Sequence, residues 1–294
     1  ICIKISFNKN VLSIHCRGFH PSIVGIIIKY LFNTKIIFDM RGFWIDEKVD
    51  TKRINKTSII DSFIFKILKK LENFLLKKSD FIVVLTLKVK NYLLKTKNLN
   101  EERLFVIPCS VDYKNFYIES KKFNKNELFN KLNIKNDYKI ICYCGSISEY
   151  YMIDEMFHLF EKLYNKNKKY YFLLITNQKI DLNKNLYNKE YKDNIILQNS
   201  EWKNIPGLLS CADVMLSLIK PTFAKIASSP TKVAEGFALG KPLLCNTGIG
   251  DLDWIVNDNN LGYVFDINNL SKLDNIDSII DQLLNISKDK IINQ

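Results

Sequence analysis

The sequence predicts an α/β fold made of two Rossmann-like, doubly wound domains that face a cleft. Short apolar runs rich in β-branched and aromatic residues alternate with helical patterns, which is typical of parallel sheets with crossover helices. A polar stretch rich in Lys and Asn, residues 117–137, interrupts this alternation, and a new series begins behind it. The length of 294 residues also favours two domains. We therefore expect an N-terminal domain over 1–118 and a C-terminal domain over 119–294.

The first domain is predicted to contain four strands and three helices. Its strands are runs of four or five residues with high β-propensity, and its helices repeat apolar residues at spacings of three and four. The chain begins with Ile1 rather than Met and enters an apolar run at once, so we expect this domain to be truncated at its start. The predicted strands are 11–15, 35–39, 81–85 and 104–107, and the predicted helices are 22–31, 58–78 and 87–94.

The second domain is predicted to contain six short strands. In doubly wound folds a ligand binds at the carboxyl ends of the strands, so motifs that follow a strand carry the most weight. The stretch 183–194, rich in Asn and Lys, predicts a loop. The predicted strands are 139–144, 170–176, 195–198, 214–218, 243–246 and 263–265.

The composition favours a globular, cytoplasmic protein without a metal or cofactor. The chain is 47% hydrophobic and 25% charged, and it has no run of about 18 apolar residues that would span a membrane. Its seven cysteines show no Cys-x-x-Cys spacing, which is typical of reduced thiols. The three histidines lie far apart in the sequence and suggest no zinc pattern. We therefore expect metal-independent chemistry.

Positive charge is concentrated in residues 48–100, which hold thirteen Lys or Arg against four Asp or Glu within a chain of net charge +12. The segment 58–78 predicts a basic amphipathic helix. Such a helix binds an anionic membrane surface, with about 1 kcal/mol from each basic residue near the lipid, or packs on the core with a solvated lysine face. Both interpretations fit the pattern. Nucleic acid fits less well, because no aromatic residues interleave a basic stretch in the way of an RNA-binding motif.

The most informative segment is 228–246, which predicts a loop, a helix and a buried strand in close succession. Pro230 and Thr231 are typical of a first helical turn, whose free N–H groups and positive dipole end attract an anion. Lys232 adds a positive charge there. Glu235 lies one turn further along, where its carboxylate can accept hydrogen bonds from a sugar hydroxyl. The segment thus predicts a phosphate and ribose site, and the alternative is an ordinary surface helix with a charged first turn.

Polar motifs also follow the predicted strands of the first domain. His15 ends the first strand, and Asp39 and Arg41 lie at the end of the second. We interpret these three as an acceptor-side catalytic group. The alternatives are a structural histidine for His15, and a solvated loop with a local Arg41 ion pair for Asp39, Asp46 and Glu47.

Taken together, these motifs resemble the retaining glycosyltransferases of the GT-B fold, in the large family usually numbered four. The order and spacing of the pieces hold over nearly the whole chain, and the Ser-Ser-Pro-Thr-Lys run resembles the branch that assembles surface polysaccharides and glycoconjugates. The matching pieces are Glu72 before 79–86, then 106–112 with Phe116, 143–146, 205–206 with 211–214, and 228–232 through 248–251.

The resemblance implies a role for each part of the chain. The second domain binds a nucleotide-sugar donor, and the first presents a glycan or lipid-linked acceptor at the inner face of the cell membrane. Glu235 takes the ribose hydroxyls, and the stretch from Trp202 to Pro206 borders the base. The diphosphate is bound by Ser229, Thr231 and Lys232, with Gly145 and Ser146 in the loop beneath it.

Three departures from the family pattern stand out. The first glutamate of the family's pair falls at Ala227, the usual Arg and Lys pair is missing from 148–152, and Arg41 stands where the family often has a histidine. Lys225 and Lys232 would then supply the missing phosphate charge. A guanidinium cannot act as a base, but in a front-face mechanism the leaving diphosphate takes the acceptor's proton.

Three functions follow from this pattern. The first is a retaining glycosyltransferase in polysaccharide biosynthesis, peripheral to the membrane and without nucleic acid as a partner. The second is a non-catalytic sugar-nucleotide-binding or partner subunit with the same fold, which the departures favour. The third is a sugar-nucleotide epimerase of the same fold, for which the sequence offers fewer ionisable groups than expected.

Overall fold

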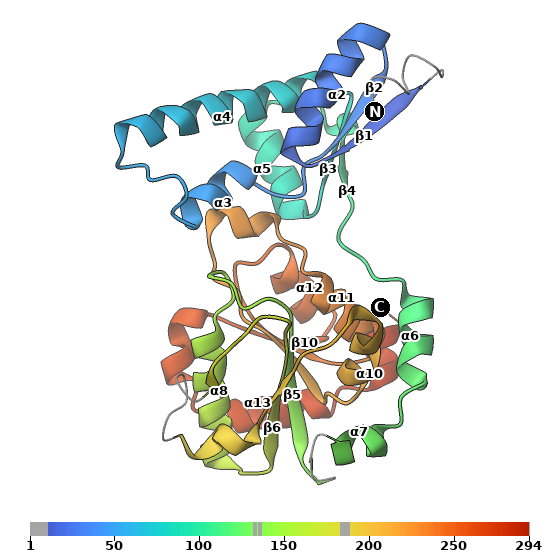
Figure 1. Cartoon of the computed structure of the whole chain (residues 1–294), viewed down its shortest axis with the longest axis vertical. Coiled ribbons are helices and arrows are strands. Elements are labelled where there is room, and N and C mark those ends of the chain that lie inside the picture. Colours follow the sequence, from blue (N-terminus) through green and yellow to red (C-terminus); the bar gives the residue numbers. More distant parts are fainter. Residues whose placement is uncertain (1–10, 132–133, 135–136, 183–188, 294) are drawn as a thin grey trace. The chain divides into compact units, whose positions relative to one another are not determined.

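The computed structural model describes residues 11–131, 134, 137–182 and 189–293, which form two α/β units with one parallel sheet each (Figure 1). The predicted fold class is thereby confirmed. Unit 1 consists of Ile1–Pro108, Pro221–Ser229 and Gly248–Asp251, and unit 2 consists of Cys109–Lys220, Pro230–Thr247 and Leu252–Gln294.

The division of the chain differs from the predicted boundary at 118/119, which falls inside a helix. Unit 2 begins at Cys109, and two short segments of the expected second domain, 221–229 and 248–251, pack on unit 1. The reason is local packing. Ala224 and Ala227 are buried in the core of unit 1, and the Asp251 carboxylate accepts hydrogen bonds from the backbone N–H groups of Leu87 and Lys88.

Unit 1 has four parallel strands in the order β1-β2-β3-β4, joined by crossover helices. Because such crossovers are right-handed, a sheet that grows in one direction places these helices on the same face. Ile26, Leu75 and Leu93 from these helices pack with Phe38 and Ile82 of the sheet. The elements are β1 (Ser13–Arg17), α2 (Phe19–Phe32), β2 (Lys35–Asp39), α3 (Trp44–Asp50), α4 (Ile59–Lys78), β3 (Phe81–Val84), α5 (Leu87–Lys97), η1 (Glu101–Arg103), β4 (Leu104–Val106) and η4 (Phe223–Ala227).

Unit 2 has six parallel strands in the order β10-β9-β8-β5-β6-β7. The order reverses between β5 and β8, which makes this the point where a doubly wound sheet binds ligands. Figure 1 shows α8 on one side of the sheet and α6 and α10 on the other. The strands are β5 (Lys139–Cys144), β6 (Tyr170–Ile175), β7 (Ile195–Gln198), β8 (Val214–Ser217), β9 (Leu243–Asn246) and β10 (Gly262–Phe265).

The helices of unit 2 cover a sheet whose inner strands β5, β6, β8 and β9 are buried on both faces, as continuous apolar runs such as that of β6 predict. The helices are α6 (Tyr113–Lys121), α7 (Lys125–Lys131), α8 (Ile153–Lys166), α10 (Ile205–Ser210), α11 (Thr231–Ala238), α12 (Leu252–Asp258), α13 (Ile276–Leu284) and α14 (Lys288–Ile292), with 3₁₀ turns η2 (Glu190–Asn194), η3 (Trp202–Asn204) and η5 (Ile267–Lys272).

The polar stretch 117–137 is more regular than its composition predicts, because α6 and α7 occupy most of it. The Asp112 side chain caps α6 by accepting from the N–H of Asn115, and Phe116 and Phe129 are buried at 2% and 3% exposure. Two buried aromatic residues thus anchor an otherwise polar segment. Of the predicted loop 183–194, residues 183–188 lie outside the described part, and 190–194 form η2.

The predicted amphipathic helix forms as α4, whose N-terminus is capped by Ser58. Its C-terminal half packs on the core through Leu75 and Leu76. Its N-terminal half packs less completely, because Phe65 is partly buried against the core but Ile60 and Phe63 are 71% and 64% exposed. The core-packing interpretation therefore holds for the C-terminal half of the helix and only in part for the N-terminal half. No helix of the described residues has the length and apolar character needed to cross a membrane.

Candidate functional site

The loop after β5 lies at the switch point of unit 2 and begins with Gly145. Its φ of +147° lies in the region that favours glycine, and its N–H donates to the carbonyl of Ile175. A Cβ on this residue would lie 3.1 Å from Lys232 Nζ and 3.3 Å from Tyr143 Oη. Glycine is therefore required here both for the backbone conformation and for the close approach of a lysine.

The predicted helix start forms as the N-terminus of α11. Pro230 is the N-cap residue and offers no side-chain acceptor, and Thr231 is exposed. The N–H of Val233 donates to the carbonyl of Pro230. The first turn of α11 thus keeps its positive dipole end without a capping side chain.

Lys232 is not a surface lysine but is buried at 9% exposure. Its Nζ donates to the hydroxyl of Tyr143 at 3.0 Å, and it lies 4.2 Å from the ring centroid of Tyr143 and 3.9 Å from that of Tyr151. The Tyr143 hydroxyl in turn donates to the backbone carbonyl of Ser146. One tyrosine therefore connects the helix lysine to the loop after β5.

Burial shifts the titration of the charged groups around Lys232. Loss of water lowers the pKa of Lys232 to about 7, although the nearby Cys144 and Glu235 act in the opposite direction. Burial raises the pKa of Glu235, an effect that the positive charge of Lys232 counteracts. Burial also raises the pKa of Cys144 to about 12, so this cysteine stays a neutral thiol.

A pocket of about 270 Å³ opens beside this loop, at the carboxyl ends of β5, β6 and β7. The side-chain carbonyl of Gln178 accepts from the hydroxyl of Ser146 at 2.9 Å and from the N–H of Ile147, so it fixes the loop. Ile205 lines the pocket, and the buried Pro206 follows it in the first turn of α10. The pocket is lined by Cys144, Gly145, Ser146, Ile175, Thr176, Asn177, Gln178, Ser200 and Ile205.

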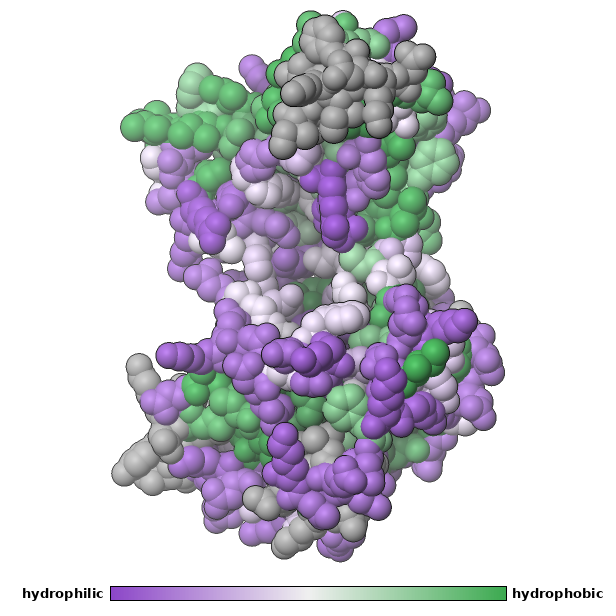
Figure 2. All heavy atoms as spheres, turned by 45° about the vertical axis from the view of Figure 1, so that its right-hand side comes forward, coloured by the Kyte–Doolittle hydropathy of each residue, from purple (hydrophilic) through white to green (hydrophobic). Residues whose placement is uncertain are grey.

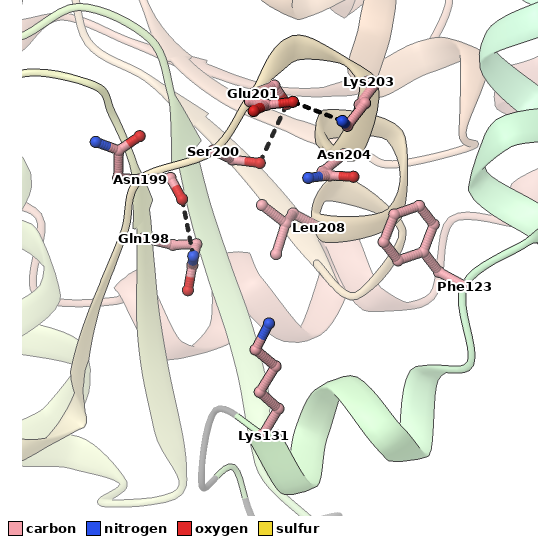
Figure 3. A pocket seen from close by; sticks show the side chains of 9 residues that line it. All are labelled: Phe123, Lys131, Gln198, Asn199, Ser200, Glu201, Lys203, Asn204 and Leu208. Carbon is pink, nitrogen blue, oxygen red and sulfur yellow. Dashed lines mark hydrogen bonds and ion pairs between the residues drawn. The ribbon is translucent and has the colours of Figure 1, made fainter.

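A larger cavity of about 460 Å³ lies on the other side of Ser200, and its lining includes Lys203 and Asn204 from the stretch expected to border the base. Figure 3 shows Lys131 of α7 reaching toward Leu208, with Phe123 closing one side. Lys203 forms an ion pair with Glu201 at its rim, at 2.7 Å. Two distant parts of the sequence, α6–α7 and 198–208, form this cavity, and no local pattern indicates it.

In unit 1 the structure brings together the three predicted acceptor-side residues. Asp39 is buried at 5% exposure, and its Oδ2 lies 3.5 Å from His15 Nε2 and 3.9 Å from Arg41 Nη1. Its Oδ1 is buried and has no hydrogen-bond partner within the described residues. Arg41 has a φ of +57°, a strained value for a residue other than glycine. One oxygen of the Asp39 carboxylate thus lies near His15 and Arg41, and its other oxygen is buried and unsatisfied.

Two predicted donor-side residues, Lys225 and Ser229, belong to unit 1. Lys225 Nζ forms an ion pair with Glu47 at 3.0 Å, and Asp46 pairs with Lys69 at 2.9 Å. Part of the charge that Lys225 was expected to offer to a phosphate is therefore compensated. Ala227, where the resemblance places a glutamate, is buried at 3% exposure in an apolar core.

The structure thus gathers the predicted residues in two groups. Gly145, Ser146, Lys232 and Glu235 come together in unit 2, next to Thr231 and near Pro206. His15, Asp39 and Arg41 come together in unit 1. Within the described ranges, no group of three His, Cys, Asp or Glu side chains is arranged to hold a metal ion.

Sequence reasoning missed three residues of the unit 2 site. Tyr143 and Tyr151 surround Lys232. Gln178 fixes the loop after β5. Gln178 comes shortly after β6. Because ligands bind at the carboxyl ends of strands in such sheets, its position could have marked it as a site residue.

Comparisons with known proteins bear on the family and the fold. The family model described as glycosyl transferases group 1 matches residues 124–291. No curated protein sequence matches the chain.

Solved structures with the same fold include a glycosyltransferase from Rickettsia africae, at 19% identity and a TM-score of 0.68, covering 99% of this chain and 74% of that one. A second is HepE from Anabaena, in complex with UDP and glucose, at 12% identity and a TM-score of 0.67, with coverage of 99% and 74%. A third is WaaG, a glycosyltransferase involved in lipopolysaccharide biosynthesis, at 14% identity and a TM-score of 0.63, with coverage of 92% and 78%.

Proposed function

Because the chain belongs to the group 1 glycosyl transferases, we propose that it transfers a sugar from a nucleotide-diphosphate donor to a glycan or lipid-linked acceptor, with retention of configuration. The observation that carries this proposal is the convergence of Lys232, the Gly145–Ser146 loop and the start of α11 at the switch point of unit 2. Such a convergence suits a group with two adjacent phosphates.

The donor is proposed to bind with its diphosphate at Lys232 and its nucleoside in the adjoining pocket of about 270 Å³. Thr231 and Ser146 are exposed polar residues at the two ends of this arrangement. Glu235 is half-buried on the same helix, one turn after Thr231, where its carboxylate can accept from the ribose hydroxyls. The similar HepE structure contains UDP, which supports a nucleotide of this class.

The chemistry requires stabilisation of the departing diphosphate more than a base. As the bond between sugar and phosphate breaks, negative charge develops on the leaving oxygen, and a pre-positioned ammonium group and helix N-terminus lower the energy of that state. The diphosphate oxygen can accept the proton of the incoming hydroxyl on the same face. No side chain of the site then has to remove a proton, and no metal ion is needed.

The acceptor is proposed to bind in unit 1 at Asp39. Its Oδ1 is buried without a partner, a condition that costs about 1–3 kcal/mol unless a ligand hydroxyl donates to it. His15 is exposed at 59% of its side chain and lies beside the same carboxylate. Hydroxyl groups of a glycan are donors of the required kind.

A lipid-linked acceptor is supported by the exposed apolar surface that α2 and α4 form in unit 1. On α4 this surface continues the stripe of Ile60 and Phe63, and on α2 it includes Ile27 at 52% exposure. Figure 2 shows hydrophobic residues gathered on unit 1 at the upper left. The residues of this surface are Val24, Ile27, Tyr30, Leu31, Ile59, Ile60, Phe63, Ile64, Ile67 and Phe74.

Exposed lysines border the same surface. Lys66, Lys70, Lys77 and Lys78 of α4 are all exposed. An apolar stripe flanked by ammonium groups fits the boundary between anionic headgroups and acyl chains, where each lysine adds about 1 kcal/mol. We therefore propose that the protein is peripheral to an anionic membrane, on its cytoplasmic face.

A non-catalytic sugar-nucleotide-binding subunit is the second candidate, because Ala227 occupies the position of a family glutamate and lies in an apolar core. The test is a screen of UDP-, GDP-, ADP- and dTDP-sugars with glycan and lipid-linked acceptors, in which free nucleoside diphosphate is measured. Release that depends on an acceptor, with an unchanged anomeric configuration in the product, supports the transferase. Binding of a donor without turnover for any acceptor identifies the silent subunit.

A further inference from the structure

Lys232 is the only buried lysine among the described residues, at 9% exposure. A buried ammonium group usually pairs with a carboxylate, but no ion pair of Lys232 occurs in the described part. Its only hydrogen-bond partner there is the Tyr143 hydroxyl. The nitrogen is thus surrounded by two aromatic rings and a glycine, with one acceptor.

The two rings are held in place independently of the lysine. The Tyr143 ring is completely buried in β5, and its hydroxyl is fixed by the carbonyl of Ser146. Tyr151 forms an isolated antiparallel bridge with Ile219, and its N–H donates to the carbonyl of Ser148 at 2.8 Å. The ring centroids are 6.0 Å apart, with Lys232 Nζ close to both. We call Tyr143 and Tyr151 the lysine cage.

The cage exerts opposing effects on the charge of Lys232. Burial disfavours the ammonium form, because water is excluded from it. The faces of two aromatic rings favour the ammonium form, and so does the Tyr143 hydroxyl, which accepts a hydrogen bond from it. An anion that arrives at the Gly145–Ser146 loop would add a further stabilising charge about one hydrogen bond away from Nζ.

We propose that Tyr143 and Tyr151 are positioning residues that make Lys232 a proton-dependent anion receptor, which takes up one proton from solvent when a nucleoside diphosphate binds beside the Gly145–Ser146 loop. The reaction is Lys232–NH₂ plus H⁺ plus the diphosphate, giving the ion pair of Lys232–NH₃⁺ with a phosphate oxygen. This inference rests on the proposed donor site. It adds that donor affinity depends on pH through this lysine.

Few ionisable groups face Lys232, which limits the possible sources of proton exchange near neutral pH. The pKa of Lys232 is lowered to about 7, so that above neutral pH the unoccupied site is mostly uncharged. The ionisable groups that face it are Tyr143 and Cys144 of β5, Tyr151 and Glu235. Burial raises the pKa of both Tyr143 and Cys144, so these two stay neutral between pH 7 and 9. Glu235 and Tyr151 are the remaining groups that could exchange a proton, and the variants Glu235→Gln and Tyr151→Phe test them.

The test is calorimetric titration with the tightest-binding member of UDP, GDP, ADP and dTDP, in buffers of different ionisation enthalpy at pH 8. Above pH 7.5 the terminal phosphate, with a pKa of roughly 6, contributes little proton exchange. We expect uptake of nearly one proton and an affinity that falls about fivefold between pH 7 and 8, since the protonated fraction of the free lysine falls by that factor. Lys232→Arg should bind without proton uptake, because a guanidinium is always charged.

Variants of the cage separate positioning from simple packing. Tyr143→Phe keeps the ring but removes the acceptor for Nζ, so the alkaline loss of affinity should begin at a lower pH. Tyr151→Leu removes one ring and should act in the same direction, whereas Tyr151→Phe keeps both rings and should retain the wild-type pH profile. A uniform loss of affinity at every pH in all three variants would show that the cage only packs.

The failures of the two proposals are distinguishable. Binding of a diphosphate without proton uptake overturns the inference and leaves the donor site standing. If the proton exchange persists in Lys232→Arg but disappears in Glu235→Gln, the Glu235 carboxyl is the group that exchanges the proton. This result also overturns the inference. A folded wild-type protein that binds none of the four diphosphates overturns the proposed function itself.

Discussion

Replacing Lys232 by methionine should make the protein more stable and less active at the same time. Methionine fills nearly the same volume but needs no proton. The free energy cost of burying the lysine follows from its pKa, which falls from 10.5 to about 7. At 1.36 kcal/mol for each pKa unit, this difference corresponds to about 5 kcal/mol below pH 7, as an upper limit. This value already includes whatever the two ring faces contribute, so we expect a gain of up to about 5 kcal/mol in the free energy of unfolding below pH 7.

The pH dependence of this gain has a definite sign. Between pH 7 and 10.5 the unfolded chain holds a proton on Lys232 that the folded chain has released. The wild-type protein therefore gains stability as the pH rises through this window, whereas the methionine variant does not. The difference between the two proteins should be largest below pH 7 and should vanish near pH 10.5.

Urea unfolding at pH 6, 8 and 10 measures this difference, and release of nucleoside diphosphate measures the activity. Turnover should fall by about 100-fold, the loss found when one group that stabilises a developing anion is removed. Lys166→Met, which changes an exposed lysine of α8, is the matched control and should alter neither quantity. A methionine variant that is less stable than the wild type at pH 6, or that turns over normally, would refute the reasoning.

Four further results are expected. Glu235→Ala should weaken nucleoside diphosphate binding by about 10–100-fold in calorimetry, the value of a hydrogen bond to a charged group, whereas an unchanged affinity would remove Glu235 from the ribose site. Because burial raises the pKa of Glu235, donor binding should also decline on the acid side at a higher pH than an ordinary carboxyl predicts, and a flat acid limb would contradict this. Asp39→Asn should raise the KM for the acceptor and leave that for the donor unchanged; equal changes in both would speak against an acceptor role. Changing Ile60 and Phe63 to Ser should reduce partitioning to anionic vesicles in flotation by at least about 100-fold, since burial of each side chain contributes about 1.5–3 kcal/mol, while Ser at the exposed Ile107 and Ile118 should not.

Strands and helices could be predicted closely because their signals are local. The apolar run that forms β6 is buried along its whole length, and the Ser58 side chain caps α4 where the sequence places its start. The path of the chain between the units could not be predicted. Residues 221–229 pack on unit 1 through Ala224 and Ala227, and small apolar residues carry no signal for the surface that they will bury.

The candidate site shows the same limit. Lys232 was singled out because it follows Thr231 at a helix start, but its burial depends on Tyr143 and Tyr151, which come from other elements. The pairing of Lys225 with Glu47 likewise joins residues far apart in the sequence. The periodicity of α4 could not decide whether its apolar face is buried or exposed, because a helix with one apolar face fits a core and a membrane equally well.

A crystal structure with a bound nucleoside diphosphate tests the central claim most directly. The claim is that Lys232, the Gly145–Ser146 loop and the first turn of α11 together hold the two phosphates. We expect phosphate oxygens at about 3 Å from Lys232 Nζ and from backbone N–H groups of the loop or of α11. A diphosphate found in the cavity between Phe123, Lys131 and Leu208, with Lys232 still enclosed by its two tyrosines and touching no phosphate, would contradict it.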